Sequence, residues 1–199
     1  MSKRQGLDIA RGRELIYSRP HVAAVDQGFW HPVWTIDKYI DHRDRIARAA
    51  RAGLNHREIM AQFDPQHTRL MRQGNCLLNA GINMMWTAIA GTGATLFNNA
   101  NAYIGVGDSS TAAAPTQTGL QAATNKTYQP MNSSYPTYGA SQLCTWQSTF
   151  STSQANYAWN EVLVCNSSGG TVALNRYVSS MGTKTSAASW VASLQVTLS

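Results

Sequence analysis

The residues that could act as acids, bases or metal ligands are concentrated near the N-terminus of this chain. All five histidines and eight of the ten acidic residues lie in the first 72 positions, and the remainder holds only two side-chain carboxylates, Asp108 and Glu161. A hydrolase or transferase needs a nucleophile beside a base, or a pair of carboxylates. The histidine pair His56 and His67 has no third ligand at metal-site spacing. The sequence therefore predicts no catalytic residues, no metal site and no cofactor.

One pair of charged residues in the C-terminal part has the spacing of an ion pair. If residues 167–170 close a symmetric β-hairpin, Glu161 lies directly opposite Arg176. They are the only charged residues on the two expected strands, and their neighbours on that face are apolar. Such a pair would be largely desolvated, so that losing one partner would cost about 3–5 kcal/mol. The alternative is a β-bulge that sends both side chains to solvent, and in either case the role is structural.

A group of arginines is the main candidate binding surface. This arginine cluster consists of Arg43, Arg45, Arg48, Arg51 and Arg57. The cluster surrounds a turn similar to that of a helix–turn–helix, which would place His56 and Arg57 against DNA. The second helix is only about two turns long, however, and Asp41, Asp44 and Glu58 dilute the positive charge. We therefore expect a solvated helical face that is available for protein contacts, and no nucleic-acid partner.

The arginines belong to an expected helical section, residues 41–93. Asp41 is the expected N-cap of a helix over residues 42–52. Asn55 and Glu58 form a capping-box pattern at the start of a second helix. These signals predict two short helices in succession.

A third helix is expected to follow and to run to about Ala90. Asp64 can cap it, with Pro65 in the first helical position. Its apolar face is expected at Leu78, Ile82, Met85 and Ile89, which follow helical spacing. Gly81 weakens the helix, so we expect packing to hold it in place.

Residues 1–40 show no sustained hydrophobic period and are predicted to form an extended arm. The arm contains three large aromatic residues, Phe29, Trp30 and Trp34. Either this segment lies across its own domain, or it inserts these side chains into a neighbouring subunit, because aromatic residues anchor interfaces.

From residue 94 onward the hydrophobic pattern has a period of two residues, which is typical of β-strands. The expected strands cover residues 102–108, 126–131, 143–150, 157–166, 171–179 and 189–199. The last strand alternates most clearly, with Trp190, Ala192, Leu194, Val196 and Leu198 on one face. Turn signals at roughly 8–12-residue spacing predict an antiparallel β-sandwich over residues 94–199, either jelly-roll or immunoglobulin-like. The whole chain is thus expected to be α+β.

The composition narrows the class of protein further. Of 199 residues, 43% are hydrophobic, which is enough for a core, but only 13% are charged, against about a quarter in an average globular protein. A soluble monomer usually carries interspersed surface charge. The low charge therefore predicts a protein that packs against neighbouring molecules. The three widely spaced cysteines and the absence of a long apolar run predict a reducing compartment, with no secretory signal and no membrane partner.

Several short motifs occur in the order found in a known group of proteins. They are GNCLLNAGIN (74–83), FNNANAYIGVGDSST (97–111), YAWNEV (157–162), LNR (174–176) and GTK (182–184). As a set they resemble a group of virion structural proteins of tailed bacteriophages, variously labelled virion, tail-associated or fibre-like. The similarity covers roughly residues 73–199. It implies a non-enzymatic component of the phage particle.

Together these features predict a virion protein, most simply a capsid-surface decoration or cement protein. Its expected partners are the major capsid protein or other virion proteins, together with copies of itself, and assembly would take place in the host bacterial cytoplasm. The arm and the arginine cluster would bind the shell. One alternative is a neck, tail or fibre-base component. Another is a host-surface glycan-binding module that uses Tyr135, Tyr138 and Trp146, because exposed aromatic rings can stack on sugars.

Overall fold

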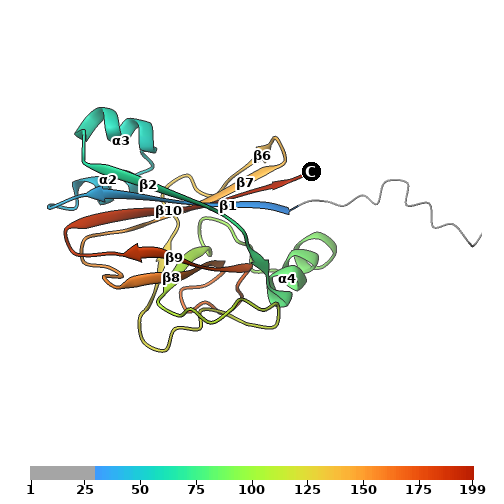
Figure 1. The fold of residues 1–199 in the computed structure, drawn as a ribbon. Coiled ribbons are helices and arrows are strands. Elements are labelled where there is room, and N and C mark those ends of the chain that lie inside the picture. The colour runs from blue at the N-terminus through green and yellow to red at the C-terminus, as the bar shows by residue number, and fades with distance from the viewer. Residues whose placement is uncertain (1–29) are drawn as a thin grey trace, which may run out of the picture. The chain divides into compact units, whose positions relative to one another are not determined.

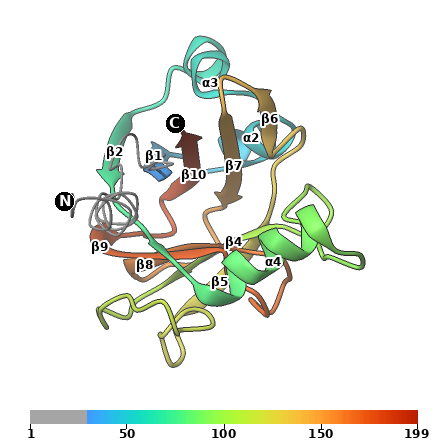
Figure 2. The ribbon, with the colours of Figure 1, turned by 90° about the vertical axis from the view of Figure 1, so that its right-hand side faces the viewer.

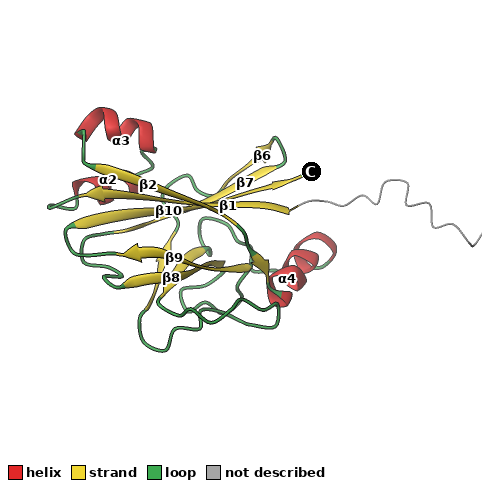
Figure 3. Ribbon diagram, in the orientation of Figure 1, coloured by secondary structure: helices red, strands yellow, loops and turns green. Residues whose placement is uncertain are grey.

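The computed structural model describes residues 30–199 and shows a mostly β architecture (Figures 1 and 3). Ten strands form two antiparallel sheets of five strands each, and three helices accompany them in this range. Residues 1–29, which include Phe29 and most of the expected arm, lie outside the described residues.

The first sheet has the strand order β2-β1-β10-β7-β6. Its strands are β1 (Trp30–Ile40), β2 (His67–Gln73), β6 (Thr137–Ala140), β7 (Leu143–Phe150) and β10 (Ala188–Leu198). The longest pairing joins β1 to β10, with Trp30 opposite Leu198 and Ile40 opposite Ala188. This pairing places the beginning and the end of the described chain side by side in the sheet.

The second sheet has the order β3-β9-β8-β4-β5. Its strands are β3 (Cys76–Leu77), β4 (Tyr103–Gly107), β5 (Lys126–Pro130), β8 (Ala158–Cys165) and β9 (Asn175–Thr183). The helices are α2 (Arg45–Arg51), α3 (His56–Phe63) and α4 (Asn79–Ala90). The α2–α3 pair lies over the outer face of the first sheet, and α4 lies beside the second sheet at the other side of the molecule (Figures 1 and 2).

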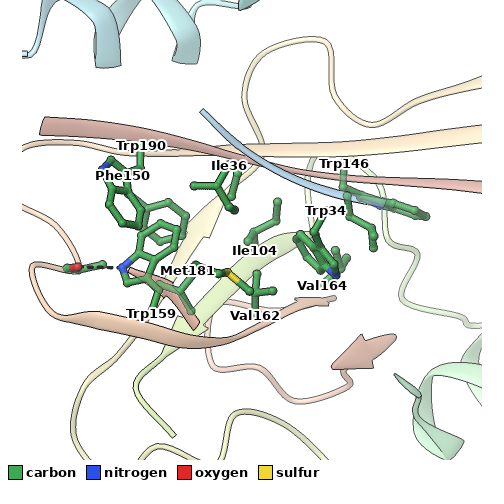
Figure 4. Close-up of a cluster of buried hydrophobic side chains, with 14 of the residues drawn as sticks. Trp34, Ile36, Ile104, Trp146, Phe150, Trp159, Val162, Val164, Met181 and Trp190 are labelled. Atoms are coloured by element: carbon green, nitrogen blue, oxygen red, sulfur yellow. Dashed lines mark hydrogen bonds between the residues drawn. The ribbon is translucent and has the colours of Figure 1, made fainter. Parts of the chain in front are cut away.

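The main hydrophobic core lies between the two sheets, as in a β-sandwich (Figure 4). Its centre is built from aromatic rings, with Trp159 edge-on to both Phe150 and Trp190 at centroid distances of 4.7 Å. The predicted inward face of β10 is confirmed for Trp190, Ala192, Leu194 and Val196, which are buried in this core, but Leu198 at its end is 46% exposed. On the opposite face Val191 is buried as well, because α2 and α3 cover it. The side chains of the main core are contributed by both sheets, so the core holds the sheets together.

The structure corrects the predicted boundary of the arm. Residues 30–40 form β1, which lies inside the first sheet between β2 and β10. Large and β-branched residues in this segment suit a strand that is paired on both edges. The sandwich therefore takes strands from residue 30 onward, and not only from residue 94.

The expected third helix is also corrected. Asp64 ends α3 in a left-handed conformation, with φ of 42°, and does not begin a new helix. The following residues pair with β1 as β2, and Gly74, with φ of 132°, interrupts the chain before β3. Only α4, from Asn79 to Ala90, remains of the predicted helix.

The predicted cap of the second helix is confirmed, but that of the first is wrong. Asn55 and Glu58 form the predicted capping box, with hydrogen bonds of 2.8 and 3.1 Å. Asp41 is not the N-cap of the first helix, because α2 begins at Arg45, three residues later than predicted, with Asp44 in the cap position. The buried carboxylate of Asp41 still accepts hydrogen bonds from the backbone N–H groups of Arg45 and Ala47.

Candidate functional site

The predicted ion pair is present. The guanidinium Nε of Arg176 lies 2.6 Å from Oε2 of Glu161, and both side chains are fully buried. The register differs from the expected one, because Glu161 is opposite Val178 and the arginine reaches it diagonally. The pairing is already shifted by one residue beside the loop, where Cys165 is opposite Ala173 and not Val172. A second shift lies next to Asn175, whose side-chain oxygen accepts the hydrogen bond of the Val164 backbone N–H.

The ion pair fastens a long loop, residues 108–125, to the outer face of the second sheet. Glu161 accepts hydrogen bonds from the backbone N–H groups of Gln121 and Ala122 at 3.0 and 2.7 Å. Arg176 donates to the side-chain oxygen of Gln117 and to the carbonyl oxygen of Thr111, both at 2.9 Å. These bonds satisfy both charged groups inside the protein, so the role of the pair is structural.

The five residues of the arginine cluster are all exposed on the α2–α3 side of the molecule. Arg51 is held by its own chain, because it donates to the side chain of Gln154 at 2.5 Å and to the carbonyl oxygen of Thr149. Arg45 lies over the ring of Phe63, at 5.9 Å. The structure thus presents this surface to solvent as a charged face.

The aromatic residues predicted as anchors divide into different environments. Trp34 is only 1% exposed and belongs to the main core, which corrects its assignment as a contact residue. Trp30 is half-buried at the start of β1 and lines a cavity. Phe29 lies outside the described residues.

The three residues proposed for glycan stacking do not form a shared platform. Tyr138 is 77% exposed, whereas Tyr135 is half-buried. Trp146 is buried and donates its indole N–H to the carbonyl oxygen of Phe97 at 2.9 Å. Of the three rings, only that of Tyr138 is presented to solvent.

An uncharged apolar surface surrounds α4. Trp86 and Ile89 on this helix are 63% and 73% exposed, and Leu96 beyond it is 47% exposed. No charged residue occurs between Arg72 and Asp108. Large apolar side chains normally lie inside a protein, and contiguous exposed groups of them mark interaction sites. We call Trp86, Ile89 and Leu96 the α4 surface.

A cavity of about 590 Å³ opens next to the α4 surface. Met85 of α4 lines one part of it, and Trp30, Phe97, Trp146 and Leu198 line other parts. The lining is mostly apolar, and Met85 belongs to the same helix as the exposed Trp86 and Ile89. It offers no pair of a nucleophile and a base.

The structure also brings together a polar cluster that sequence reasoning missed. Asp37 on β1, His67 on β2 and His56 at the start of α3 place one potential ligand atom each within 4.8 Å of one another. Oδ1 of Asp37 lies 2.8 Å from Nε2 of His67, and Arg69 binds both carboxylate oxygens at 2.6 and 3.0 Å. The hydroxyl of Tyr39 lies 2.7 Å from Nδ1 of His56. We call Asp37, His56 and His67 the His–Asp cluster.

Burial and neighbouring charge shift the pKa values of His56 and Arg69 at this site. Burial is the main cause that lowers the pKa of His56, so its imidazole is neutral near pH 7. The hydrogen bond to Asp37 raises the pKa of Arg69, which remains charged. The rings of His56 and His67 lie 4.4 Å apart between centroids, so two protonated imidazoles would repel each other at close range.

Comparison with protein-family models, with curated proteins and with solved structures finds no match to this chain. Among the described residues, no helix has the length and the apolar character needed to cross a bilayer.

Proposed function

We propose that this chain is a non-enzymatic structural component of a tailed-phage virion, and within that class a capsid-surface decoration or cement protein. The motif resemblance over residues 73–199 supports the class. The observation that carries the proposal is the α4 surface, because a segment with exposed tryptophan and isoleucine and no charge is suited to permanent contact with another protein. The sandwich itself would be of the jelly-roll or immunoglobulin-like kind.

The partner proposed for the α4 surface is a second copy of the chain. Two copies that meet through uncharged apolar surfaces bring no like charges together, so the surface is compatible with itself. Full burial of an isoleucine such as Ile89 contributes about 1.5–3 kcal/mol. Several such side chains, with the adjoining cavity, provide the apolar centre that a homodimer interface needs.

The arginine cluster is the proposed contact with the shell. Arg43, Arg48 and Arg57 are exposed on the side of the molecule that carries α2 and α3, away from α4 (Figure 2). Arginine can bind carboxylates through two parallel hydrogen bonds, so an acidic patch on a capsid protein is a suitable partner. A neck, tail or fibre-base position would use the same two surfaces against different neighbours.

The first experiment measures self-association of the purified full chain by sedimentation velocity. We expect an oligomer for the unmodified protein and a shift to monomer for Trp86→Lys and Ile89→Lys. Met71→Lys is the matched control, because Met71 is 58% exposed on β2, outside the α4 surface. An unmodified protein that is monomeric, or variants that associate as before, would contradict the proposed self-contact.

The second experiment measures the copy number of the chain in purified particles relative to the major capsid protein. A copy number comparable to that of the major capsid protein supports decoration. A copy number that corresponds to one small ring per particle supports the neck or tail. If intact particles lack the chain altogether, the proposed function is wrong.

A further inference from the structure

We propose that Asp37, His56 and His67 form a binding site for a divalent transition-metal ion, with Zn²⁺ the ion that suits the ligands best. Two imidazoles and one carboxylate, on three separate elements, offer ligand atoms within 4.8 Å of one another. Nitrogen and carboxylate oxygen are ligands that Zn²⁺ takes at about 2.0–2.2 Å in tetrahedral sites. The fourth position would be left to water. This inference is independent of the virion role.

Rigid elements hold the three ligands. Asp37 and His67 sit on neighbouring strands, where β1 and β2 pair Asp37 with Arg69 and Tyr39 with His67. The capping box that starts α3 fixes the backbone at His56. A metal site requires side chains that are already positioned, so ligands on paired strands and at a capped helix start are well placed.

The hydrogen bond between His56 and Tyr39 is of the kind found around metal sites. Nδ1 of His56 lies 2.7 Å from the hydroxyl of Tyr39, so this nitrogen can donate its proton to the tyrosine oxygen and leave Nε2 as the ligand. A histidine ligand is commonly oriented by a hydrogen bond from its other nitrogen. Tyr39 is only 1% exposed, which keeps its hydroxyl in a fixed position.

Binding at His67 and Asp37 requires one proton to move and a small opening. Without metal, the 2.8 Å contact between Nε2 of His67 and Oδ1 of Asp37 is a hydrogen bond that the imidazole donates. An ion between these atoms needs the other tautomer, with the proton on Nδ1 and the lone pair on Nε2. Two bonds of about 2.0–2.1 Å at a tetrahedral angle place the ligand atoms about 3.3 Å apart. The Asp37–His67 pair must therefore widen by about half an ångström, and the ligand atom of His56, which lies up to 4.8 Å from the others, must approach by up to about 1.5 Å.

Arg69 competes with the ion, and this competition gives the proposal a specific consequence. Its guanidinium binds both oxygens of Asp37, at 2.6 and 3.0 Å, and carries a positive charge next to the site. Removal of Arg69 should free Oδ1 and reduce the electrostatic repulsion of a cation. If the cluster only holds α3 on the sheet, the same substitution removes an interaction and provides no gain in metal binding.

The test is a titration of the full-length chain, without a polyhistidine tag, with Zn²⁺ in a calorimeter near pH 7. We expect one ion per chain, at least tenfold weaker binding in His56→Gln and in His67→Gln, and severalfold tighter binding in Arg69→Met. His42→Gln is the matched control, because His42 is an exposed histidine outside the cluster, and it should bind as the unmodified chain does. Circular dichroism of each variant verifies that the fold is retained.

A Co²⁺ absorption spectrum distinguishes this site from the three cysteines. Ligation by the His–Asp cluster gives visible bands without thiolate charge transfer, whereas ligation by cysteine adds that transfer. The proposal is overturned if the unmodified chain takes up no ion, if the two glutamine variants bind as tightly as the unmodified chain, or if Arg69→Met weakens binding. A spectrum with thiolate charge transfer overturns it as well.

Discussion

Replacement of one member of the Glu161–Arg176 pair is expected to lower the free energy of unfolding by about 3–5 kcal/mol. Both side chains have no exposed surface, so the charge that remains after a single substitution cannot be hydrated. Glu161→Gln leaves a buried guanidinium with neutral acceptors, and Arg176→Met leaves a buried carboxylate with two backbone N–H donors. Either loss is a large share of the total stability of an ordinary domain.

The double variant, Glu161→Gln with Arg176→Met, should lose less than the two single losses added together. Neither charge is left in the interior, so the penalty for an unpaired buried charge disappears, and only the lost hydrogen bonds to residues 108–125 remain. Residues in one network typically show coupling of about 0.5–3 kcal/mol, and a fully buried pair belongs at the upper end of that range.

Urea unfolding of the full chain, followed by tryptophan fluorescence, measures all three variants. Arg57→Met is the control, because Arg57 is exposed and its loss should change stability by no more than about 0.5 kcal/mol. Losses that add within about 0.5 kcal/mol would refute the reasoning, since additivity means that the two charges do not depend on each other.

Two further predictions concern close packing and pH. Gly81→Ala should lower the Tm in a thermal melt. Its Cβ would lie 2.5 Å from Cα of Leu174, and the cost of this overlap exceeds the roughly 1 kcal/mol that alanine normally gains over glycine in a helix. A higher Tm would contradict this. Burial raises the pKa of Cys165 from 9.0 to about 12, so the folded state keeps a proton that the unfolded chain releases. Stability should therefore fall as the pH rises from 9 towards 12, by up to about 1.4 kcal/mol per pH unit from this group. In Cys165→Ala, the free energy of unfolding measured with urea should depend less on pH between about pH 8 and pH 11. An unchanged pH dependence would show that the thiol does not contribute.

Most strands with one face in the main core were predictable, but β1 was assigned to the arm although it buries Trp34 and Ile36 there. The limits of β7 agree with the sequence prediction, and β10 differs by one residue at each end. In these strands alternation reports burial directly. The edge strands β2 and β6 were missed, because an edge strand with polar residues has no clear alternation, and its pairing depends on residues far away in sequence.

The candidate sites were predictable to the extent that their chemistry is local. Glu161 and Arg176 stand out as the only charges on two neighbouring strands, but the register shifts beside the loop and next to Asn175 in a way that hairpin symmetry does not indicate. The His–Asp cluster was missed because Asp37 joins His67 only through the β1–β2 pairing. That pairing could not be proposed while residues 67–73 were assigned to a helix.

The α4 surface shows a different limit of periodicity. Leu78, Ile82, Met85 and Ile89 were expected to form one buried face. Leu78 is fully buried, but Ile89 is 73% exposed. Helical spacing indicates that a face needs an apolar partner, but it does not tell whether the partner belongs to the same chain. The exposed end of this face, at Ile89, therefore favours a contact with a second molecule.

The outer faces of the two sheets are covered in different ways, and this gives the buried ion pair a structural role. Helices α2 and α3 cover the first sheet through apolar side chains, with Ile46, Ala50 and Ile59 packed on Tyr39 and Val191. Residues 108–125 cover the second sheet with no strand or helix of their own. Backbone groups in such a segment must find partners elsewhere. The ion pair supplies three of them, as the acceptor for two N–H groups and the donor to one carbonyl oxygen. The ion pair therefore holds the loop on the second sheet, as apolar packing holds the helices on the first. A well-packed apolar pair in place of Glu161 and Arg176 could restore stability, but it would not restore the position of the loop.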